Sequence, residues 1–238
     1  MRSLWLRRAF EETPREVFVP RFYRSESGRE VLVDGADPRQ HDEWLRGVYT
    51  DDVLTVQLTT APDLAEGAAG APTSSSTMPT VMAGMLEALD VQRGHRVLEI
   101  GTGTGYNAAL LCHRVGPEHV VSVELESNLA DAARQALARL GLHPAVHTGD
   151  GAAGLAAAAP FDRIIATAAT DHTPLSWISQ LAPGGRIVVD LRGSLDGSLL
   201  RVTAIDSDVV EGTFLHLPGA FMLPSNRAIR LWVRRAQQ

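Results

Sequence analysis

With 238 residues and a formal net charge of −6, the chain lacks the basic excess that marks nucleic-acid-binding proteins. Hydrophobic residues make up 45% of the composition, which is typical of a globular protein and excludes wholesale disorder. The single cysteine, Cys112, excludes an intrachain disulfide framework, and no apolar run reaches the roughly 20 residues that cross a bilayer, so we expect a cytoplasmic protein without a nucleic-acid or membrane partner.

The N-terminal third of the chain shows little periodicity. Residues 1–24 read as a helix that two prolines end, and the polar stretch after it contains one strand candidate, "REVLVDG". A tract of small residues, 61–78, has the composition of a loop. We therefore predict a helical and loop segment over residues 1–78 that lies over the active site.

Regular periodicity begins at Pro79, which suits the first turn of a helix that runs to about Leu89 with Thr77 as its N-cap. Beyond it, short β-type runs alternate with helical runs such as "NLADAARQALARLG". The β-type runs are "RVLEI", "VVSVEL", "AVHTGD", "DRIIATA" and "GGRIVVD". The alternation predicts a doubly wound, mostly parallel, Rossmann-like α/β sheet over residues 79–195. Two strand candidates in residues 196–238, "LLRVTAID" and "IRLWVRR", would complete the sheet.

The stretch "VLEIGTGTGYNAALL" joins the first of these strands to a helix through a glycine-rich turn. Gly101, Gly103 and Gly105 let the backbone approach a ligand closely and present its amides. A dinucleotide fingerprint would need glycine in place of Tyr106, and a P-loop would need Gly-Lys-Ser/Thr; the turn has neither. Glu99, at the strand end, would repel a pyrophosphate but attract the ammonium of an amino-acid moiety, so the turn favours S-adenosyl-L-methionine over NAD.

Two more acids end the next two strands, where a nucleoside would need them. Glu124 lies at the spacing of an acid that binds both ribose hydroxyls, with Glu126 as the alternative. Asp150 can accept from an adenine amino group while the amide of Gly151 meets a ring nitrogen. Because the carboxyl ends of parallel strands share one edge, these acids and the glycine turn form one predicted cofactor site. The adjoining residues that complete this site are Thr102, Tyr106, Leu125 and Thr167.

The glycine motif, with "TGDG", "FDRIIATAA", "LAPGGRIVV" and the upstream "AFEETPREVFVP", resembles the protein-L-isoaspartate O-methyltransferase family of class I methyltransferases over residues 9–190. The resemblance implies S-adenosyl-L-methionine as cofactor and S-adenosyl-L-homocysteine as its product. That family has a Thr-x-Ser-x-Pro-His-Met segment before the helix that leads to the glycine turn. Aligned on "TSSSTMP", Thr73 and Ser75 match its functional hydroxyls, whereas Thr77 and Met78 replace its proline and histidine.

The resemblance further implies methyl transfer to the carboxylate of an isoaspartyl or aspartyl residue of a protein or peptide, after which the ester closes to a succinimide. Such a carboxylate, with a pKa of about 4, is ionised at neutral pH and needs no general base. The sequence accordingly shows no catalytic His or Cys constellation and no expected metal site. Hydroxyl donors suffice to align the carboxylate with the methyl group, so we assign this contact to Ser75, with Thr73 and Ser76 in support.

Other functions remain open at this point. A relative of this family could methylate an ordinary aspartate of a ribosomally made peptide and leave an aspartimide, a reading that the departure at Thr77 and Met78 favours. A non-catalytic module would bind the cofactor without turnover. A small-molecule methyltransferase would need a catalytic base or metal set; His143 and His147 make no helical metal pair, because Pro144 interrupts them.

Overall fold

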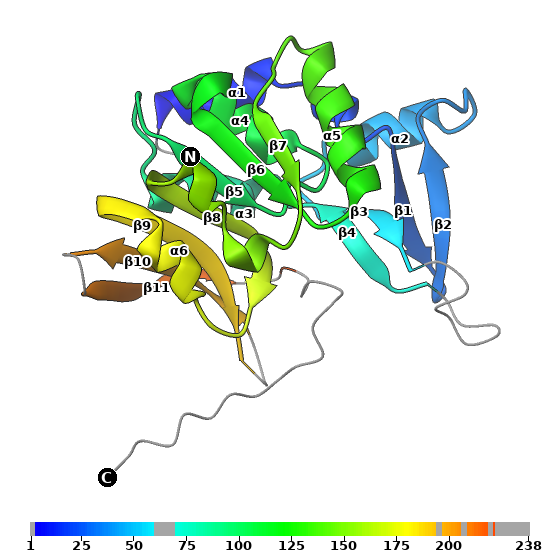
Figure 1. Ribbon diagram of the computed structural model, residues 1–238. Coiled ribbons are helices and arrows are strands. Elements are labelled where there is room, and N and C mark those ends of the chain that lie inside the picture. The colour runs from blue at the N-terminus through cyan, green and yellow to red at the C-terminus, as the bar shows by residue number, and fades with distance from the viewer. Residues whose placement is uncertain (1–2, 60–69, 194–196, 206–208, 219–220, 222–238) are drawn as a thin grey trace.

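The computed structural model describes residues 3–59, 70–193, 197–205, 209–218 and 221 (Figure 1). The N-terminal elements are α1 (Leu4–Glu12), β1 (Arg21–Glu26), β2 (Arg29–Asp34), α2 (His41–Val48), β3 (Leu54–Leu58) and β4 (Pro72–Ser76). They are followed by α3 (Pro79–Leu89), β5 (Val97–Ile100), α4 (Tyr106–Val115), β6 (Val120–Glu124), α5 (Ser127–Arg139), β7 (Ala145–Thr148), β8 (Phe161–Thr170), α6 (Leu175–Ser179), β9 (Leu181–Arg192), β10 (Gly197–Ala204) and β11 (Val210–Pro218). Short 3-10 turns are η1 (Arg15–Val17), η2 (Pro117–His119), η3 (Gly151–Ala153) and η4 (Ala156–Ala158).

A seven-stranded sheet forms the body of the molecule, with the strand order β11-β10-β9-β8-β5-β6-β7. The strands from β5 to β9 run parallel, whereas β10 and β11 continue the sheet in antiparallel pairing. The chain moves outward from β5 to β7 and then returns to the other side of β5 with β8. The strand order therefore reverses between β5 and β8, which is the topological switch point of the sheet. The predicted doubly wound, mostly parallel α/β sheet is confirmed.

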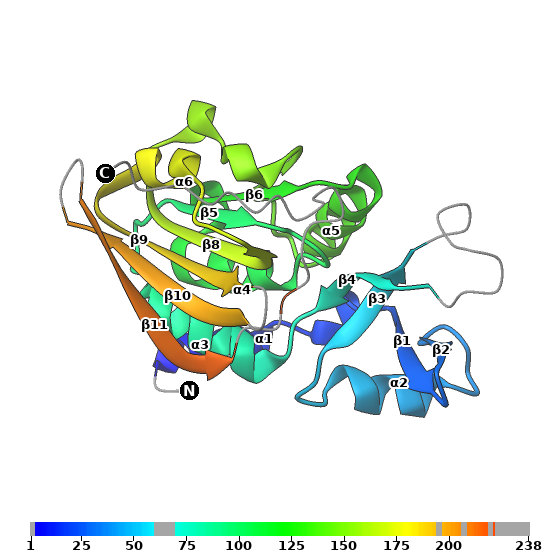
Figure 2. The ribbon, with the colours of Figure 1, turned by 90° about the horizontal axis from the view of Figure 1, so that it is seen from below.

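Alternate residues of the parallel strands point to opposite faces of this sheet and build two cores. Val97 and Val188 pack in the core that α1, α3 and α4 cover, whereas Leu98 packs in the core around Trp177 of α6. Figure 2 shows α6 on one side of the sheet and α1 and α3 on the other. Near-continuous apolar strands are what a sheet covered on both faces requires. Glu99 shares the face of Val97, so its side chain points into the protein on the side of α4.

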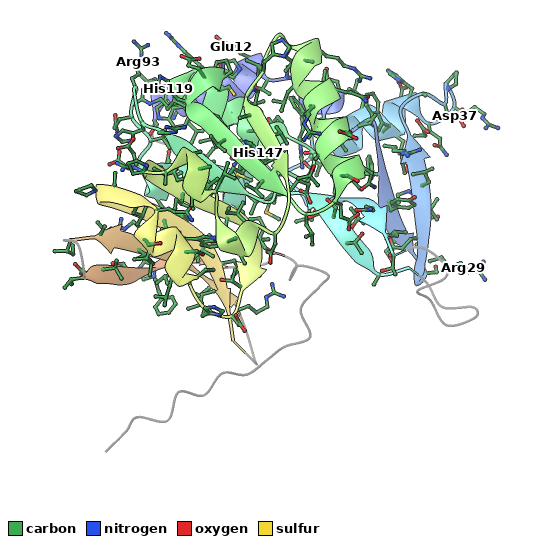
Figure 3. All side chains as sticks on the ribbon, viewed as in Figure 1. Glu12, Arg29, Asp37, Arg93, His119 and His147 are labelled. Carbon is green, nitrogen blue, oxygen red and sulfur yellow. The ribbon has the colours of Figure 1, made fainter. Side chains whose placement is uncertain are left out.

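A second, four-stranded antiparallel sheet, β2-β1-β3-β4, stands beside the main sheet and makes up most of the N-terminal segment (Figure 1). The sequence predicts only helix, loops and one strand here; that strand is β2, and Arg29 and Asp37 lie towards its opposite ends (Figure 3). The helix within residues 1–24 is α1. The strands β1, β3 and β4 were not predicted, because half-buried strands of a small sheet lack a clean apolar alternation.

Strand β4 carries the serine tract at an edge of this small sheet. Its residues pair with β3, with Thr55 opposite Ser75 and Leu54 opposite Ser76. The pairing register shifts on both sides of Gln57, so the ladder between the two strands is irregular. The loop predicted for residues 61–78 is therefore a strand in its last part, while residues 60–69 lie outside the described residues.

Helix α3 begins at Pro79 and ends at Leu89, as predicted, but its first turn is capped from elsewhere. Met78 occupies the N-cap position and makes no side-chain cap. Instead, Asp51 accepts a hydrogen bond from the backbone N–H of Thr80 at 2.9 Å and a second one from the Thr80 hydroxyl. The predicted cap, Thr77, is therefore replaced by a carboxylate from the turn before β3, which favours the helix N-terminus electrostatically.

Replacing Asp51 with alanine should lower the free energy of unfolding by about 1 kcal/mol at pH 7, because it removes this cap. The hydrogen bonds from Thr80 lower the pKa of the Asp51 carboxyl below its ordinary value of 3.8. The stabilisation is therefore complete above about pH 4 and is lost as the pH falls through the lowered pKa. Urea unfolding between pH 3 and pH 7 measures both effects. Asp52→Ala is the matched control, and an equal loss in both variants would contradict the capping role.

At the C-terminal side, the strand predicted from "LLRVTAID" is β10, and β11 pairs with it as a further strand that was not predicted. The candidate "IRLWVRR" lies outside the described residues. No helix in the described ranges is both long enough and apolar enough to cross a membrane.

Candidate active site

The turn between β5 and α4 lies at the carboxyl edge of the parallel strands. Gly101, Gly103 and Gly105 all adopt positive φ, at 89°, 52° and 86°, which favours glycine over any residue with a Cβ. Gly105 also needs to be small, because a Cβ there would lie 3.1 Å from the Cβ of Ala133 on α5. A Cβ on Gly103 would meet no crowding. The nearest atom of a non-neighbouring residue would be the carbonyl oxygen of Ser75, 3.8 Å away. The turn thus presents its backbone towards β4.

Glu124 ends β6 and joins the glycine turn to the next strand. Its carboxylate accepts hydrogen bonds from the N–H of Gly103 at 2.8 Å and from the N–H of Glu126 at 3.2 Å. A carboxylate offers about four acceptor positions, so two remain for ligand hydroxyls. Glu126, the alternative ribose ligand, accepts at 2.9 Å from the side-chain amide of Gln57 on β3. The two acids therefore lie side by side, and one of them contacts the small sheet.

Glu99 is completely buried below this edge. Its carboxylate accepts hydrogen bonds from the Asn107 amide at 2.7 Å and from the Ser122 hydroxyl. Burial raises the pKa of the Glu99 carboxyl to about 7, and the nearby charge of Glu124 acts in the same direction. The buried Oδ1 atom of Asn107 has no hydrogen-bond partner among the described residues. The unpartnered Oδ1 of Asn107 thus lies beside the Glu99 carboxyl, whose pKa is close to neutral pH.

Asp150 follows β7 and lies exposed at the same edge. Its side chain accepts a hydrogen bond from the N–H of Ala152 at 2.9 Å and so caps η3. Gly151 begins that turn, and a Cβ on it would lie 2.5 Å from Cγ2 of Ile100, so only glycine lets η3 pack against β5. The edge predicted for the adenine therefore contains an exposed carboxylate followed by a close-packed backbone.

The adjoining residues of the predicted cofactor site have different environments. Thr102 is buried and shares a hydrogen bond with Ser122 at 2.6 Å, while the Thr167 hydroxyl donates to the carbonyl oxygen of Gly101. Both hydroxyls therefore hold the glycine turn in place. The Tyr106 ring is 6% exposed and packs edge-on against Phe10 and Phe18, so its side chain belongs to the core and leaves only its backbone at the turn. Leu125 follows β6 and is half-buried.

The hydroxyl residues of β4 alternate in burial. Ser74 and Ser76 are buried, whereas Thr73 and Ser75 are half-buried. The carbonyl oxygen of Ser75 and the hydroxyl of Ser74 lie 3.8 and 3.9 Å from the position of a Cβ on Gly103. The structure therefore brings the serine tract against the glycine turn, although more than 25 residues separate the two in sequence.

Ser76 points away from its neighbours in the tract and towards Arg15. Its hydroxyl oxygen lies 3.3 Å from Nη2 and 3.4 Å from Nε of that guanidinium, both of which donate to it. We predicted that Ser76 supports the substrate contact; the structure places it at 3% exposure with its hydroxyl bonded to Arg15. Arg15 lies in the stretch "TPREVFVP" that the family resemblance covers, but the sequence assigned it no role, because the signal of a buried arginine is its set of carbonyl partners in the fold.

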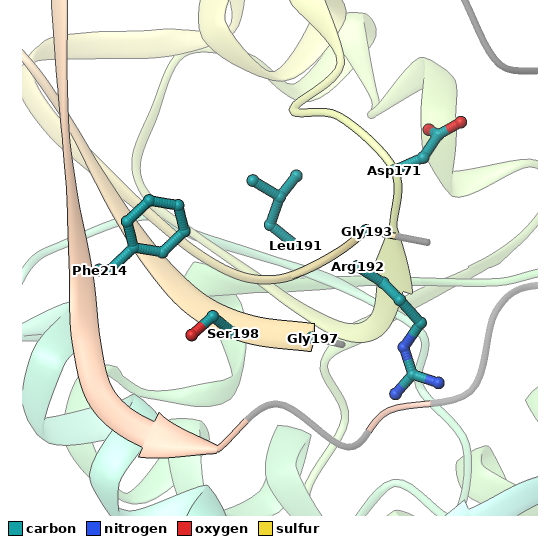
Figure 4. Close-up of a pocket in the computed structure, with 7 residues that line it drawn as sticks. All are labelled: Asp171, Leu191, Arg192, Gly193, Gly197, Ser198 and Phe214. Atoms are coloured by element: carbon teal, nitrogen blue, oxygen red, sulfur yellow. The ribbon is translucent and has the colours of Figure 1, made fainter. Parts of the chain in front are cut away.

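A shallow hollow of about 380 Å³ lies at the same edge of the sheet, where β8 and β9 end and β10 begins (Figure 4). Asp171 and Arg192 bring opposite charges to it, and Leu191 and Phe214 bring apolar surface. Because β9 is separated from β5 by β8 alone, the hollow lies about 10 Å from the glycine turn along the sheet. Among the described residues, no cluster of His, Cys, Asp and Glu has the arrangement of a metal site.

A glycine turn after the first parallel strand, acids after the next two and an antiparallel strand, β10, next to the far edge together define a class I methyltransferase. The family profile "Protein-L-isoaspartate(D-aspartate) O-methyltransferase (PCMT)" matches residues 40–213. The chain therefore belongs to this family of S-adenosyl-L-methionine-dependent enzymes, as the sequence motifs predicted.

Individual relatives agree with this assignment. A protein-L-isoaspartate O-methyltransferase of Anaeromyxobacter dehalogenans is 43% identical over 61% of this chain and 70% of its own length. The enzyme of Ignicoccus hospitalis is 45% identical over 47% of this chain and 54% of its own length. A solved protein-L-isoaspartate O-methyltransferase aligns with 93% of this chain, with 30% identity and a TM-score of 0.71, but the chain spans only 61% of that structure. A Plasmodium falciparum structure in complex with S-adenosyl-L-homocysteine has a TM-score of 0.66 at 13% identity and shows the shared fold alone.

Proposed function

We propose that this protein is a carboxyl O-methyltransferase that transfers the methyl group of S-adenosyl-L-methionine to isoaspartyl residues of proteins or peptides. The observation that carries the proposal is the close approach of the hydroxyl strand β4 to the glycine turn, in a chain that belongs to this family. The ester product would close to a succinimide by attack of the following backbone nitrogen. A single, buried cysteine suits a reducing compartment, so we place this activity in the cytoplasm.

The residues present fit the cofactor. Glu124 keeps free acceptor positions for the ribose hydroxyls, and Asp150 offers an exposed acceptor where the adenine amino group would lie. The unpartnered Oδ1 of Asn107 beside Glu99 supplies acceptors for an ammonium group. These acceptors match a nucleoside joined to an amino acid better than they match a pyrophosphate. The buried carboxylates of Glu99 and Glu124 would repel a pyrophosphate.

The chemistry asks little of the protein beyond alignment. The bound cofactor supplies an electrophilic methyl group on a sulfonium, and the acceptor carboxylate is already ionised at neutral pH. The protein must bring the two groups into line and exclude water, because a dry site favours a reaction in which opposite charges neutralise each other. Hydroxyl donors can hold the carboxylate for this purpose without the strong ion pair that a lysine or arginine would form.

The structure changes which hydroxyls we propose for this contact. Pro79 begins α3, so it can be aligned with the proline of the Thr-x-Ser-x-Pro segment in place of Thr77. Aligning the two prolines places Ser75 and Thr77 on the functional hydroxyls, in place of Thr73 and Ser75. Along β4, Ser75 points to the side opposite to Ser76, and Thr77 follows directly after the strand. We therefore propose that Ser75 and Thr77 hold the substrate carboxylate.

Labelled S-adenosyl-L-methionine and two matched peptides, one with isoaspartate and one with aspartate, test this function. We expect a base-labile methyl ester on the isoaspartyl peptide only. Label on the aspartyl peptide alone would instead support the aspartimide-forming reaction. Cofactor binding without label on either peptide would contradict carboxyl methylation of such substrates.

A further inference from the structure

We propose that Arg15 is a positioning residue for methyl transfer, because it binds Ser76 and Thr77 and so fixes the segment 75–77 that carries the proposed substrate-binding hydroxyls. The inference rests on the proposed function and names a residue from a different part of the chain. Arg15 lies in the 3-10 turn η1, which follows α1 and precedes the small sheet.

The guanidinium of Arg15 connects two backbone segments. Nη1 donates to the carbonyl oxygens of Val48 at 3.0 Å and Thr50 at 3.1 Å, and Nη2 donates to that of Asp52 at 3.2 Å. Nη2 also donates to the carbonyl oxygens of Thr77 at 3.1 Å and Ser76 at 3.4 Å. One buried group, 2% exposed, therefore ties the turn before β3 to the end of β4.

All these acceptors are neutral. In the part of the chain that the structure describes, no carboxylate forms an ion pair with Arg15. The carboxylates of Asp51 and Asp52 bond instead to the backbone N–H groups of Thr80 and Val53. A buried cation that makes only carbonyl and hydroxyl contacts stabilises one arrangement of those groups, because any shift leaves donors unsatisfied in a region closed to water.

The segment that Arg15 holds has little other support. Strand β4 lies at the edge of its sheet, its register against β3 is irregular, and it ends at Ser76. Thr77 lies beyond the strand and before α3, so its place depends on the bond from Arg15 to its carbonyl oxygen and on the start of the helix. The carbonyl oxygen of Ser75, two positions before Thr77, lies 3.8 Å from the place that a Cβ on Gly103 would occupy. Arg15 thus sets the distance between the hydroxyls and the methyl donor.

The position of these hydroxyls matters because alignment is the main demand of this reaction. A displacement of about 1 Å in a substrate-positioning group can lower a rate on the order of 10²-fold. We therefore expect the loss of Arg15 to lower the turnover of enzyme that still binds cofactor. A residue that only stabilises the fold would lower the number of folded molecules and leave the turnover of each one unchanged.

The test uses Arg15→Lys and Arg15→Met in the full chain. Lysine keeps the charge but has a single ammonium group, which cannot donate to both backbone segments, and methionine has no donors. Neither variant should therefore retain full activity. Titration with S-adenosyl-L-homocysteine counts the binding-competent molecules, and kcat and KM for the isoaspartyl peptide are expressed per competent molecule. We expect kcat to fall at least tenfold in both variants, with the Kd for S-adenosyl-L-homocysteine within threefold of the unmodified protein.

Arg163 provides a matched control. It is also buried, at 8% exposure, and donates to the carbonyl oxygens of Asp90 at 3.1 Å and Asp162 at 2.7 Å, near the amino end of β8 and thus at the opposite edge of the sheet. Arg163→Lys should lower the unfolding midpoint but leave kcat per competent molecule unchanged.

Each other outcome overturns the inference. Unchanged kcat per competent molecule in the Arg15 variants, or a fall of the same size in Arg163→Lys, would make Arg15 a residue of stability alone. Loss of all cofactor binding in both Arg15 variants would also show that Arg15 serves the stability of the fold alone. If the unmodified protein binds cofactor but methylates no isoaspartyl peptide, the proposed function fails first, and with it the role given to Arg15.

Discussion

Replacing Glu99 with glutamine should make the ligand-free protein more stable above pH 7 while weakening S-adenosyl-L-methionine binding at least tenfold. Glu99 is fully buried, and its two carboxylate oxygens accept hydrogen bonds from Asn107 and Ser122; a glutamine carbonyl can keep the one from Ser122. The amide of Asn107 can turn to present its unpartnered Oδ1 to the new NH₂ group. The variant therefore keeps the packing and removes a buried charge.

The stability difference between the two proteins should depend on pH. Burial raises the pKa of the Glu99 carboxyl from 4.5 to about 7 in the folded protein, so between these values the folded state holds a proton that the unfolded state has released. The stability of the unmodified protein therefore falls as the pH rises through this window and is flat above it. With about 1.4 kcal/mol for each pKa unit, the advantage of Glu99→Gln should reach roughly 3.5 kcal/mol at pH 8 and vanish below pH 4.5.

Binding should show the opposite trend, because the ammonium of the cofactor prefers an ionised partner. A charge-assisted hydrogen bond is worth about 1.5 to 3 kcal/mol, or roughly 10- to 100-fold in affinity. Calorimetric titration at pH 6 and pH 8 should show tighter binding at the higher pH for the unmodified protein and no such change for the variant. Glu11→Gln, on an exposed position of α1, is the control. Unaltered cofactor affinity in Glu99→Gln would show that this carboxylate does not hold the ammonium.

A second large effect is expected from the hydroxyls that we propose for the substrate carboxylate. Thr77→Val and Ser75→Ala each remove one donor with little change in volume. Each should lower kcat/KM for the isoaspartyl peptide between about 10- and 100-fold, because the carboxylate loses a contact that aligns it. The affinity for S-adenosyl-L-homocysteine should stay within threefold, since neither hydroxyl belongs to the proposed cofactor contacts.

Thr73→Val separates this assignment from the one that the sequence predicts. The Thr73 hydroxyl is buried and has no hydrogen-bond partner among the described residues, so valine should be tolerated without loss of stability. If Ser75 and Thr77 hold the substrate, Thr73→Val keeps full activity. A large loss in Thr73→Val with normal activity in Thr77→Val would restore the original alignment.

The main sheet and its ligand edge were predictable because their signals are local. Buried strands such as 97–100 read as apolar runs, and the glycines after them are required by positive φ within the same turn. The acids Glu124 and Asp150 follow from their places at strand ends. Family motifs then added the substrate class, which patterns of burial cannot supply.

The rest depends on contacts between distant segments. The sequence assigns Ser76 a supporting role in the substrate contact, and only the fold shows that it lies beside Arg15, 61 residues away. Asp51 reads as part of a solvated turn, yet it caps a helix 29 residues further on. Tyr106 adjoins the glycine turn, but the aromatic rings of Phe10 and Phe18 draw its side chain into the core. Strand β4 is hidden by its loop-like composition, because its partner β3 decides its conformation.

The turn between α2 and β3 also bears on how the chain folds. Its carbonyl groups bind Arg15 and its Asp51 carboxylate starts α3, so the small sheet and the large one share a joint at residues 48–52. The hydrogen bonds of this joint form only when Arg15, the turn and the first residues of α3 are all in place. Two sheets that would otherwise behave as separate modules should therefore unfold together, in one cooperative transition rather than two.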